Sequence, residues 1–358
     1  MREEHDVPLA ELTTMRVGGP AARLVTATTT DEVVDAVREV DDADEPLLVV
    51  TGGSNVVIAD EGFAGTVVRV GSDGVEVESA DLCGGVMVRV AAGVPWDELV
   101  ARAVAEGWSG IEALSGIPGG TGATPVQNVG AYGQEVAQTI ASVRTWDRSE
   151  QRVRTFASAD CRFTYRHSIF KGTSRFVVLD VLFQLVPGDL SQPVGYADLA
   201  RQLDVAVGDR VPLADAREAV LAQRRRRGMV LDADDHDTWS CGSFFTNPIL
   251  SASRFAALES RAASRLGPDG PTPPRFPDAG GGTKTSAAWL IEQAGFTKGF
   301  ALPGSSAAIS SKHTLALTNR GGATAAQVAD LARAVRDGVQ DAFGVTLVNE
   351  PVMVGHDL

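Results

Sequence analysis

The sequence predicts a mixed α and β protein built from two or three domains. Its 358 residues exceed the length of an ordinary single hydrophobic core. Short runs rich in β-branched residues alternate with amphipathic helical stretches, and we find no internal repeat. Hydrophobic residues make up 44% and charged residues 22% of the chain, which is typical of soluble globular proteins. We therefore expect an α+β fold assembled from α/β subdomains.

The first third of the chain predicts a small α/β unit and then a strand-rich region. The expected elements are helices over 31–40 and 95–107 and strands over 46–50, 66–70 and 75–92. The first helix, DEVVDAVREV, places four valines on one face, with Thr30 or Asp31 as its N-cap. The second helix has proline at its start and glycine at its end, as helices commonly do.

The rest of the chain predicts longer elements separated by irregular segments. They are a strand over 176–186, helices over 213–227 and 324–343, and a final strand over 345–355. Residues 110–135 are rich in glycine and lack periodicity, and so long a loop inside a compact domain is usually functional. Residues 264–285 read as an exposed loop, because a helical pattern resumes directly after them.

The charge and the cysteines restrict the partners and the compartment. A net charge of −14 argues against binding to nucleic acid or to an anionic membrane. The basic run Arg224–Arg227 is either a local phosphate site or a solvated helix end. Cys83, Cys161 and Cys241 form no CxxC pair, and the N-terminus has no apolar signal region. We expect a cytoplasmic protein with no membrane span and no metal site.

Standard nucleotide and hydrolase motifs are absent. TGGSN (51–55) follows a strand, so its backbone N–H groups could bind an anion, although it could also be an ordinary tight turn. PGGTG (118–122) lacks the third glycine of a dinucleotide fingerprint, and the lysine of GGGTKTS (280–286) does not follow a glycine. No GxSxG motif is present, and DADDHD (232–237) reads as a solvated acidic loop.

Three polar residues stand in apolar surroundings. Ser243, in WSCGSFFTNP, is either a satisfied core hydroxyl or a proton carrier kept away from water. Arg166 follows a tyrosine between apolar stretches and could equally be a surface residue. Glu350 falls inside the expected final strand, where a buried carboxylate needs a partner or a role.

Taken together, seven segments resemble the MurB family, the UDP-N-acetylenolpyruvoylglucosamine reductases of bacterial cell-wall synthesis. They occur in the family's order and span almost the whole chain. The segments are TTMRVGG (13–19), TGGSNVVI (51–58), GIPGGTGATPVQNVGAYGQE (116–135), YRHSIFK (165–171), GSFFTNP (242–248), SAAWLIEQAGF (286–296) and NEPVMVG (349–355).

The resemblance implies an FAD-binding fold of the vanillyl-alcohol-oxidase (PCMH) type with a separate α+β substrate-binding domain. The expected division is residues 1–71 with 346–358, then 72–231 as the second FAD-binding subdomain, then 232–345 over the substrate. No histidine lies in the glycine-rich loops, so we expect noncovalent FAD. By resemblance, the cofactor contacts are Gly52, Gly53, Ser54, Asn55, Gly119, Thr124, Asn128 and Gly130.

The implied reaction reduces UDP-N-acetylglucosamine enolpyruvate to UDP-N-acetylmuramate, with NADPH as co-substrate. By resemblance, Ser243 donates a proton to the substrate and Arg166 stabilises the developing negative charge. Glu350 is the second polarising group. It would have to be protonated, or share a proton, to stabilise an enolate, and a dry site favours that form.

The UDP end of the substrate is expected to contact Tyr196, Arg227 and Asn247. Relatives commonly have lysine where this chain has Arg227 and Thr246. Thr246 removes one positive charge near the site, so we expect the phosphate contacts to be redistributed. Another flavin oxidase of the same fold and a non-catalytic nucleotide-sugar sensor remain alternatives. We expect a monomer.

Overall fold

The computed structural model describes residues 1–81, 84–278 and 280–358 and has an α+β fold, as predicted. Its contacts divide the chain into two compact units. Unit 1 comprises residues 1–8, 20–53 and 63–230, and unit 2 comprises residues 9–19, 54–62 and 231–358. The finer division into three domains, with boundaries near residues 71, 231 and 345, stays a prediction.

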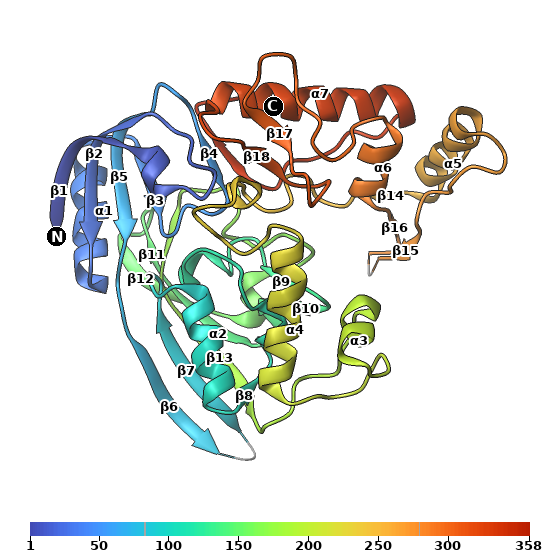
Figure 1. The fold of residues 1–358 in the computed structure, drawn as a ribbon. Coiled ribbons are helices and arrows are strands. Elements are labelled where there is room, and N and C mark those ends of the chain that lie inside the picture. Colours follow the sequence, from blue (N-terminus) through green and yellow to red (C-terminus); the bar gives the residue numbers. More distant parts are fainter. Residues whose placement is uncertain (82–83, 279) are drawn as a thin grey trace. The chain divides into compact units, whose positions relative to one another are not determined.

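Unit 1 contains two main sheets with helices packed on them (Figure 1). The first sheet has the order β1-β2-β5-β3, and the second has the path β12-β11-β13-β7-β6 with β8 paired to β13. The helices are α1 (Thr30–Asp42), α2 (Trp96–Ala105), α3 (Ala197–Leu203) and α4 (Leu213–Arg226). The strands are β1 (Arg2–Pro8), β2 (Pro20–Ala27), β3 (Leu47–Val50), β5 (Phe63–Val70), β6 (Val75–Asp81), β7 (Gly85–Ala91), β8 (Trp108–Ser109), β9 (Gly130–Ala131), β10 (Gln134–Glu135), β11 (Ile140–Asp147), β12 (Arg152–Ala157) and β13 (Phe176–Pro187).

The first sheet shows why the predicted valine pattern folds as α1. Val33, Val37 and Val40 are buried on one face of the helix, which packs against β2 and β5. The N-cap is Thr29, whose hydroxyl accepts a hydrogen bond from Glu32 N at 3.2 Å, and not Thr30 or Asp31 as predicted. Strands β2 and β3 both run parallel to β5, so α1 connects parallel strands of one sheet.

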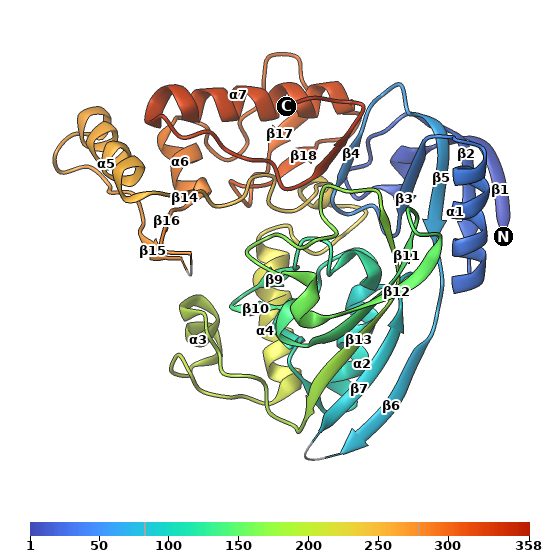
Figure 2. The same cartoon turned by 180° about the vertical axis from the view of Figure 1, so that it is seen from behind.

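The second sheet of unit 1 is antiparallel and carries the largest core (Figure 2). Strand β13 pairs with both β11 and β7, so its apolar run is buried for most of its length. Trp96, at the start of α2, packs on Phe183 of β13 with ring centroids 5.8 Å apart. Its indole N–H donates to Leu114 O at 3.1 Å, which satisfies the polar atom of an otherwise apolar contact.

The described residues of unit 2 form short strands and three helices. The helices are α5 (Ala252–Leu266), α6 (Ala287–Gln293) and α7 (Ala325–Phe343). The strands are β4 (Val56–Ile58), β14 (Ile249–Leu250), β15 (Phe276–Pro277), β16 (Thr283–Lys284), β17 (Ala307–Ile309), β18 (Leu317–Asn319) and β19 (Val352–Val354). The predicted final strand over 345–355 is mostly wrong, because only β19 is a strand, and it pairs in parallel with β4.

Short 3₁₀ turns link these elements in both units. They are η1 (Leu9–Leu12), η2 (Glu112–Leu114), η3 (Thr121–Ala123), η4 (Val136–Gln138), η5 (Ser158–Cys161) and η6 (His236–Thr238). Three of them, η2, η3 and η4, lie within or beside the glycine-rich segment 110–135 that was predicted as a functional loop.

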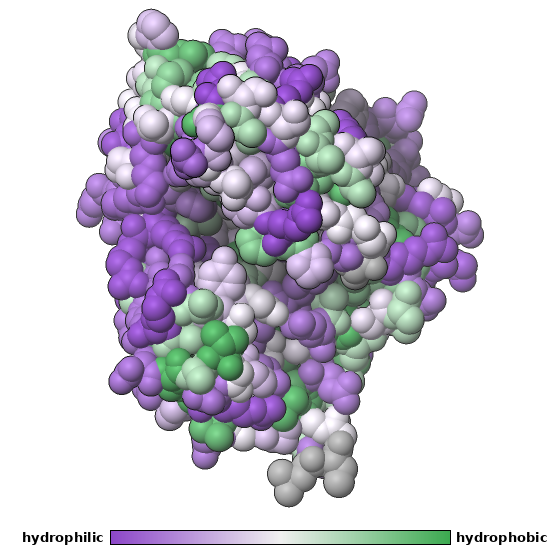
Figure 3. Space-filling view, turned by 90° about the vertical axis from the view of Figure 1, so that its right-hand side faces the viewer, coloured by the Kyte–Doolittle hydropathy of each residue, from purple (hydrophilic) through white to green (hydrophobic). Residues whose placement is uncertain are grey.

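The face of the protein drawn in Figure 3 is largely polar. Hydrophilic residues are spread over the face in Figure 3, with smaller hydrophobic groups between them. No helix in the described part of the chain combines the length and hydropathy that a membrane span needs.

The described cysteines are unreactive. Burial raises the pKa of the Cys161 and Cys241 thiols to about 12, so both are protonated at neutral pH. Cys83 lies outside the described residues.

An aspartate from one segment of unit 2 supports the first turn of α7, which generates a stability prediction. The Asp60 carboxylate accepts the backbone N–H groups of Ala325 at 2.7 Å and Ala326 at 2.9 Å. We expect Asp60→Ala to lower the free energy of unfolding by about 1 kcal/mol, as for loss of a helix cap. Asp60→Asn keeps only one of the two acceptor oxygens and places an NH2 group against the other backbone N–H, so it should recover only part of this loss. Urea unfolding measures both, and equal stability of Asp60→Ala and wild type would contradict the assignment.

Candidate active site

The predicted site residues fall into two groups, one in each unit. Unit 1 holds Gly52, Gly53, Gly119, Thr124, Asn128, Gly130, Arg166, Tyr196 and Arg227. Unit 2 holds Ser54, Asn55, Ser243, Asn247 and Glu350.

Two glycine loops of unit 1 approach each other at backbone distance. A Cβ atom on Gly52 would lie 2.7 Å from the Gly119 Cα atom, and one on Gly120 would lie 2.7 Å from the Thr51 Cβ atom. Gly53 and Gly119 have φ values of 55° and 116°, in the region that glycine tolerates best. Side chains on these loops would separate them, so the glycines are needed to form a surface lined by backbone.

The loop that follows Gly119 is fixed by hydrogen bonds to its neighbours. The Thr121 N–H and hydroxyl both donate to Val94 O, at 2.8 and 2.9 Å. Thr124 is buried and donates through its hydroxyl to Thr121 O at 2.8 Å. Its backbone O accepts the N–H of Val129 at 3.0 Å, which closes the turn before β9. The loop is therefore ordered although it is mostly irregular.

Arg166 lies at the tip of a tight turn beside this loop. Thr164 and His167 exchange both backbone hydrogen bonds, at 3.0 and 3.2 Å, so Arg166 adopts a φ of 54°. Its guanidinium donates to Gly130 O at 2.7 Å and, over a longer distance of 3.5 Å, to Asn128 O. The structure thus brings together three of the predicted residues of unit 1, namely Arg166, Gly130 and Asn128.

Tyr196 and Arg227 lie in the part of unit 1 formed by α3 and α4. Tyr196 precedes α3, is 46% exposed, and contacts the Tyr132 ring edge-on at 5.8 Å. Arg227 ends α4 and pairs with Asp198 at 3.3 Å. Tyr132 was not predicted as a site residue, although it stands in the GAYGQE segment of the glycine-rich loop.

The basic run at the end of α4 is not uniformly solvated. Arg225 is exposed, whereas Arg224 is only 7% exposed, and burial lowers the pKa of its guanidinium to about 10. It donates to Met229 O at 2.7 Å, and within the described residues its Nε has no hydrogen-bond partner. The spacing of Arg224 from the buried Val220 and Leu221 places it on the apolar face of the helix, which the sequence could have indicated.

In unit 2, backbone hydrogen bonds join the Ser243 and Glu350 segments. Glu350 N donates to Phe244 O at 2.8 Å, and the Asn55 side chain donates to Glu350 O at 3.2 Å. Gly242 has a φ of 71°, and Phe244 and Phe245 are buried in the core of this unit. Glu350 precedes β19 and is half-buried, so its predicted place inside a strand is wrong.

The start of the Ser243 segment is anchored separately. The Thr14 hydroxyl donates to Ser240 O at 2.7 Å, and Phe244 N donates to Leu315 O at 2.7 Å. Ser243 itself is half-buried, and the structure shows no hydrogen bond from its hydroxyl to another described residue. The role of Ser243 stays a prediction.

The remaining predicted residues of unit 2 lie in turns and caps. Asn247 accepts the backbone N–H of Ala287 at 3.0 Å, at the start of α6. Ser54 lies half-buried in the turn before β4. Thr246, where relatives commonly have lysine, donates to Val348 O through both its N–H at 3.0 Å and its hydroxyl at 3.3 Å. This side chain therefore helps to fasten the segment that leads to Glu350.

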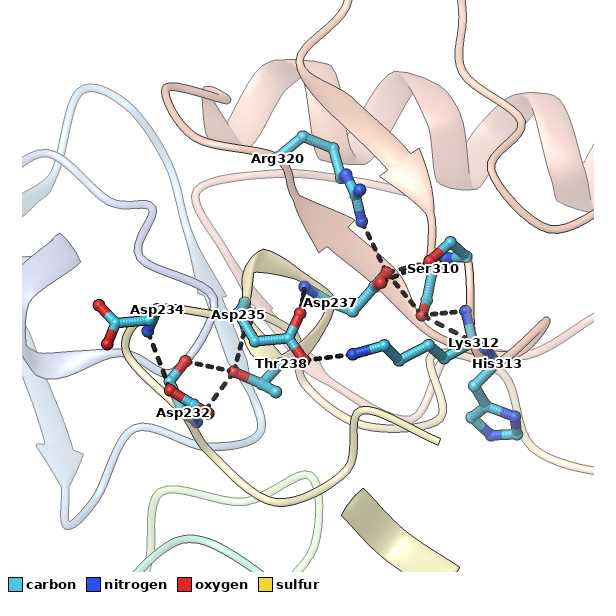
Figure 4. A network of polar contacts seen from close by, with 10 residues as sticks. Asp232, Asp234, Asp235, Asp237, Thr238, Ser310, Lys312, His313 and Arg320 are labelled. Carbon is cyan, nitrogen blue, oxygen red and sulfur yellow. Dashed lines mark hydrogen bonds and ion pairs between the residues drawn. The ribbon is translucent and has the colours of Figure 1, made fainter. Parts of the chain in front are cut away.

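The acidic loop before Ser243 is solvated in its first half, where Asp232 and Asp234 are exposed, and forms a polar network in its second half (Figure 4). Asp237 is 4% exposed and accepts from the Ser310 hydroxyl at 2.9 Å and from Arg320 at 2.6 Å. Asp235 pairs with Lys312. No group of three or more His, Cys, Asp or Glu in the described part of the chain is arranged to hold a metal ion. The network attaches η6, just before the Ser243 segment, to residues that follow β17 and β18.

Comparison with known proteins finds similarity along the whole chain. Residues 21–155 match an FAD binding domain, and residues 234–354 match the C-terminal domain of UDP-N-acetylenolpyruvoylglucosamine reductase. The reductase of that name from Thermobifida fusca is 58% identical and covers 98% of this chain and 97% of its own. The one from Mycobacterium tuberculosis is 50% identical over 98% of this chain and 94% of its own.

A solved structure agrees with these matches. The crystal structure of UDP-N-acetylenolpyruvylglucosamine reductase (MurB) from Thermus caldophilus superposes with a TM-score of 0.64 at 25% identity and covers 99% of both chains. The expected fold, with an FAD-binding part and a separate C-terminal part, is confirmed.

The Asp237 network predicts loss of stability in acid. Burial alone would raise the pKa of this carboxyl, but hydrogen bonds from Ser311 and Ser310 and the charge of Arg320 hold it below its usual 3.8. A carboxyl whose pKa is lowered by folding stabilises the protein above the unfolded-state pKa, and this contribution is lost as pH falls through the folded-state pKa.

We therefore expect Asp237→Asn to lower the free energy of unfolding by about 2 kcal/mol at pH 7. Below about pH 4 the free energies of unfolding of the variant and the wild type should become more similar, because the wild-type carboxyl becomes protonated. Asp234→Asn, at an exposed carboxylate of the same loop, should change stability by less than about 0.5 kcal/mol. Urea unfolding between pH 3 and pH 7 gives both differences. If the difference in the free energy of unfolding between Asp237→Asn and wild type stays constant down to pH 3, the ionised form of Asp237 is not what stabilises the fold.

Proposed function

This chain belongs to the family of UDP-N-acetylenolpyruvoylglucosamine reductases, and on that premise we propose which of its residues perform the reaction. It is an FAD-dependent oxidoreductase that reduces UDP-N-acetylglucosamine enolpyruvate to UDP-N-acetylmuramate in peptidoglycan precursor synthesis. NADPH is the reductant. The observation that carries this assignment is 58% identity to a reductase of that name over 98% of the chain.

The glycine loops of unit 1 fit FAD. Between Gly52 and Gly119 the backbone is so close that no Cβ atom can be accommodated, and this leaves main-chain N–H groups to meet a pyrophosphate. We assign Gly52, Gly53 and Gly119 to the cofactor, with Thr124 and Gly130 in the loop that follows. Ser54 and Asn55 continue the first loop. When bound, FAD would supply the redox chemistry, which is hydride transfer from NADPH to the terminal vinyl carbon of the enolpyruvyl ether.

Arg166 stabilises the charge that the hydride transfer creates. Addition of hydride to the vinyl group moves negative charge onto the substrate carboxylate, which becomes enolate-like. A guanidinium held in advance by Gly130 O stabilises that charge without reorganising during the reaction. Arginine suits this role because its planar donors match the two oxygens of a carboxylate.

Ser243 and Glu350 complete the reaction. The Ser243 hydroxyl donates a proton to the second vinyl carbon, which quenches the enolate. A serine is a weak acid in water, but placement beside a strong base makes proton transfer effective. Glu350 polarises the same carboxylate in its protonated form, and its hydrogen bond to Phe244 supports a common placement with Ser243.

Tyr196, Arg227 and Asn247 are assigned to the nucleotide-sugar end. Tyr196 is exposed, so its ring is accessible to a ligand. Arg227 supplies a cation for phosphate, and its pairing with Asp198 orients the side chain. A cytoplasmic location, a monomeric state and roles in cell shape and division are further proposals that follow from the nucleotide-sugar substrate and its cell-wall product.

The first test separates the two halves of the reaction. We expect Ser243→Ala to leave reduction of FAD by NADPH within about threefold of wild type, because no substrate proton moves in that step. Reoxidation by the enolpyruvyl substrate should slow by roughly 10²–10⁴-fold, the range of a general acid. Stopped-flow absorbance of the flavin measures each half. Ser243→Cys, which keeps a transferable proton, should recover part of the rate, and equal slowing of both halves would contradict the role.

The second test concerns the phosphate contact. We expect Arg227→Ala to raise the KM for the UDP substrate roughly tenfold, the effect of losing one charge-assisted hydrogen bond, with kcat within about twofold. Arg225→Ala is the matched control, because Arg225 is an exposed cation of the same helix end that pairs with Glu218. A similar rise in KM for both variants would show that only the net charge matters.

A further inference from the structure

We propose that Asn128 and Glu135 are positioning residues that hold the Arg166 turn, and that the Asn128 side chain does not contact FAD. The resemblance assigns Asn128 to the cofactor, and the proposal revises that assignment. This proposal rests on the proposed role of Arg166 in the reaction. The experiment below distinguishes a failure of this proposal from a failure of the proposed function.

The Asn128 side chain is fully occupied by the protein. It is 1% exposed, and its amide nitrogen donates to the Glu135 carboxylate at 2.8 Å and to Thr164 O at 3.1 Å. Its amide oxygen accepts the backbone N–H of Ala137 at 3.1 Å. An amide has only two N–H donors, so no donor remains for a ligand. Only one orientation of the amide satisfies these partners, because a backbone N–H must meet oxygen and a carboxylate must meet nitrogen.

These hydrogen bonds connect the arginine turn to the β9–β10 hairpin. Thr164 is the first residue of the turn whose tip is Arg166, so the bond to Thr164 O fixes the base of that turn. Glu135 belongs to β10 and pairs across the hairpin with Gly130, whose carbonyl receives the Arg166 guanidinium. Asn128 therefore fixes the backbone at the start of the turn, and the Gly130 carbonyl in the hairpin fixes the Arg166 guanidinium.

The backbone conformations agree with this interpretation. Asn128 and Arg166 have φ values of 48° and 54°, in the left-handed region. Asparagine enters that region more readily than most residues, whereas arginine does so only where its surroundings hold it. A turn held in a rare conformation needs external hydrogen bonds, and the Asn128 amide supplies one.

Glu135 sets the direction of the Asn128 amide. Its carboxylate accepts from Asn128 and also caps η4, whose Gln138 side chain accepts from Glu135 N at 3.1 Å. A Cβ atom on Gly130 would lie 2.8 Å from Glu135 Cγ and 3.1 Å from Arg166 Nη1. The glycine thus lets the carboxylate stem and the guanidinium approach the same backbone position.

The experiment compares Glu135→Ala with Glu135→Gln in the full-length, FAD-loaded protein. The alanine variant removes the acceptor for Asn128, while the glutamine variant keeps an acceptor oxygen at the same place. For Glu135→Ala we expect the Kd for FAD, measured by flavin fluorescence, and the rate of flavin reduction by NADPH to stay within threefold of wild type. Reoxidation by the enolpyruvyl substrate should slow at least tenfold, and Glu135→Gln should restore it to within threefold.

Asn128→Asp supplies a second measurement, because the cap on η4 is retained. It keeps the shape of the side chain but loses both N–H donors and faces the Glu135 carboxylate. We expect the same pattern, with FAD affinity retained and the second half-reaction slowed.

A loss of FAD affinity of more than tenfold in Asn128→Asp would overturn the proposal and favour a direct flavin contact. Unchanged reoxidation in Glu135→Ala, or equal slowing of both half-reactions, would overturn it as well. Failure of the wild-type flavin to be reoxidised by the enolpyruvyl substrate would instead contradict the proposed function.

Discussion

One backbone hydrogen bond, from Glu350 N to Phe244 O, determines how unit 2 presents its share of the proposed chemistry. It joins a segment close to the C-terminus to the segment that carries Ser243, and neither is regular secondary structure at that point. Phe244 also donates to Leu315 O, so its peptide is held on both sides. This bond keeps the backbone that carries the Ser243 hydroxyl close to the backbone that carries the Glu350 carboxyl.

Unit 1 holds its irregular loops in place by side-chain hydrogen bonds and by the sheet on which they stand. Its glycine loops and the Arg166 turn are irregular, but they stand on a long antiparallel sheet whose core includes Trp96 and Phe183. Side-chain amides and hydroxyls, such as those of Asn128 and Thr121, replace the ladder hydrogen bonds that a strand would provide. The backbone can then approach a flat cofactor closely, because order does not depend on bulky side chains.

Local pattern predicted some long elements, such as α1 and β13, but missed others, such as α5 and β11, and most of the short ones. The valine spacing of α1 and the apolar run of β13 recur within a few residues, so the sequence alone predicts them. The final strand was overextended because Val345 and Leu347 are apolar for another reason: they pack in the core of unit 2 and pair with no strand. Pairing of β19 with β4 depends on a segment far away in the sequence, which periodicity cannot reveal.

The site shows the same limit. The family resemblance supplied Ser243, Arg166 and Glu350, whereas the burial of Asp237 needed the fold, because it belongs to a charged run that resembles solvated surface. Arg224 also belongs to a charged run, but its spacing from Val220 and Leu221 already places it on the apolar face of α4. Composition cannot show which aspartates of the acidic loop are buried. Asp234 is exposed, whereas Asp237, three residues later, is buried among hydroxyls and a guanidinium.

The parallel pairing of β4 with β19 has a consequence for biosynthesis. The ribosome makes Val56–Ile58 long before Val352–Val354, so the earlier strand emerges well before its partner exists. During that interval its apolar residues and unpaired peptide groups are open to non-native association, a hazard typical of contacts between distant parts of a chain. The pairing of β4 with β19 can therefore form only after Val352–Val354 has been made, whereas all segments of unit 1 precede residue 231 and are made earlier.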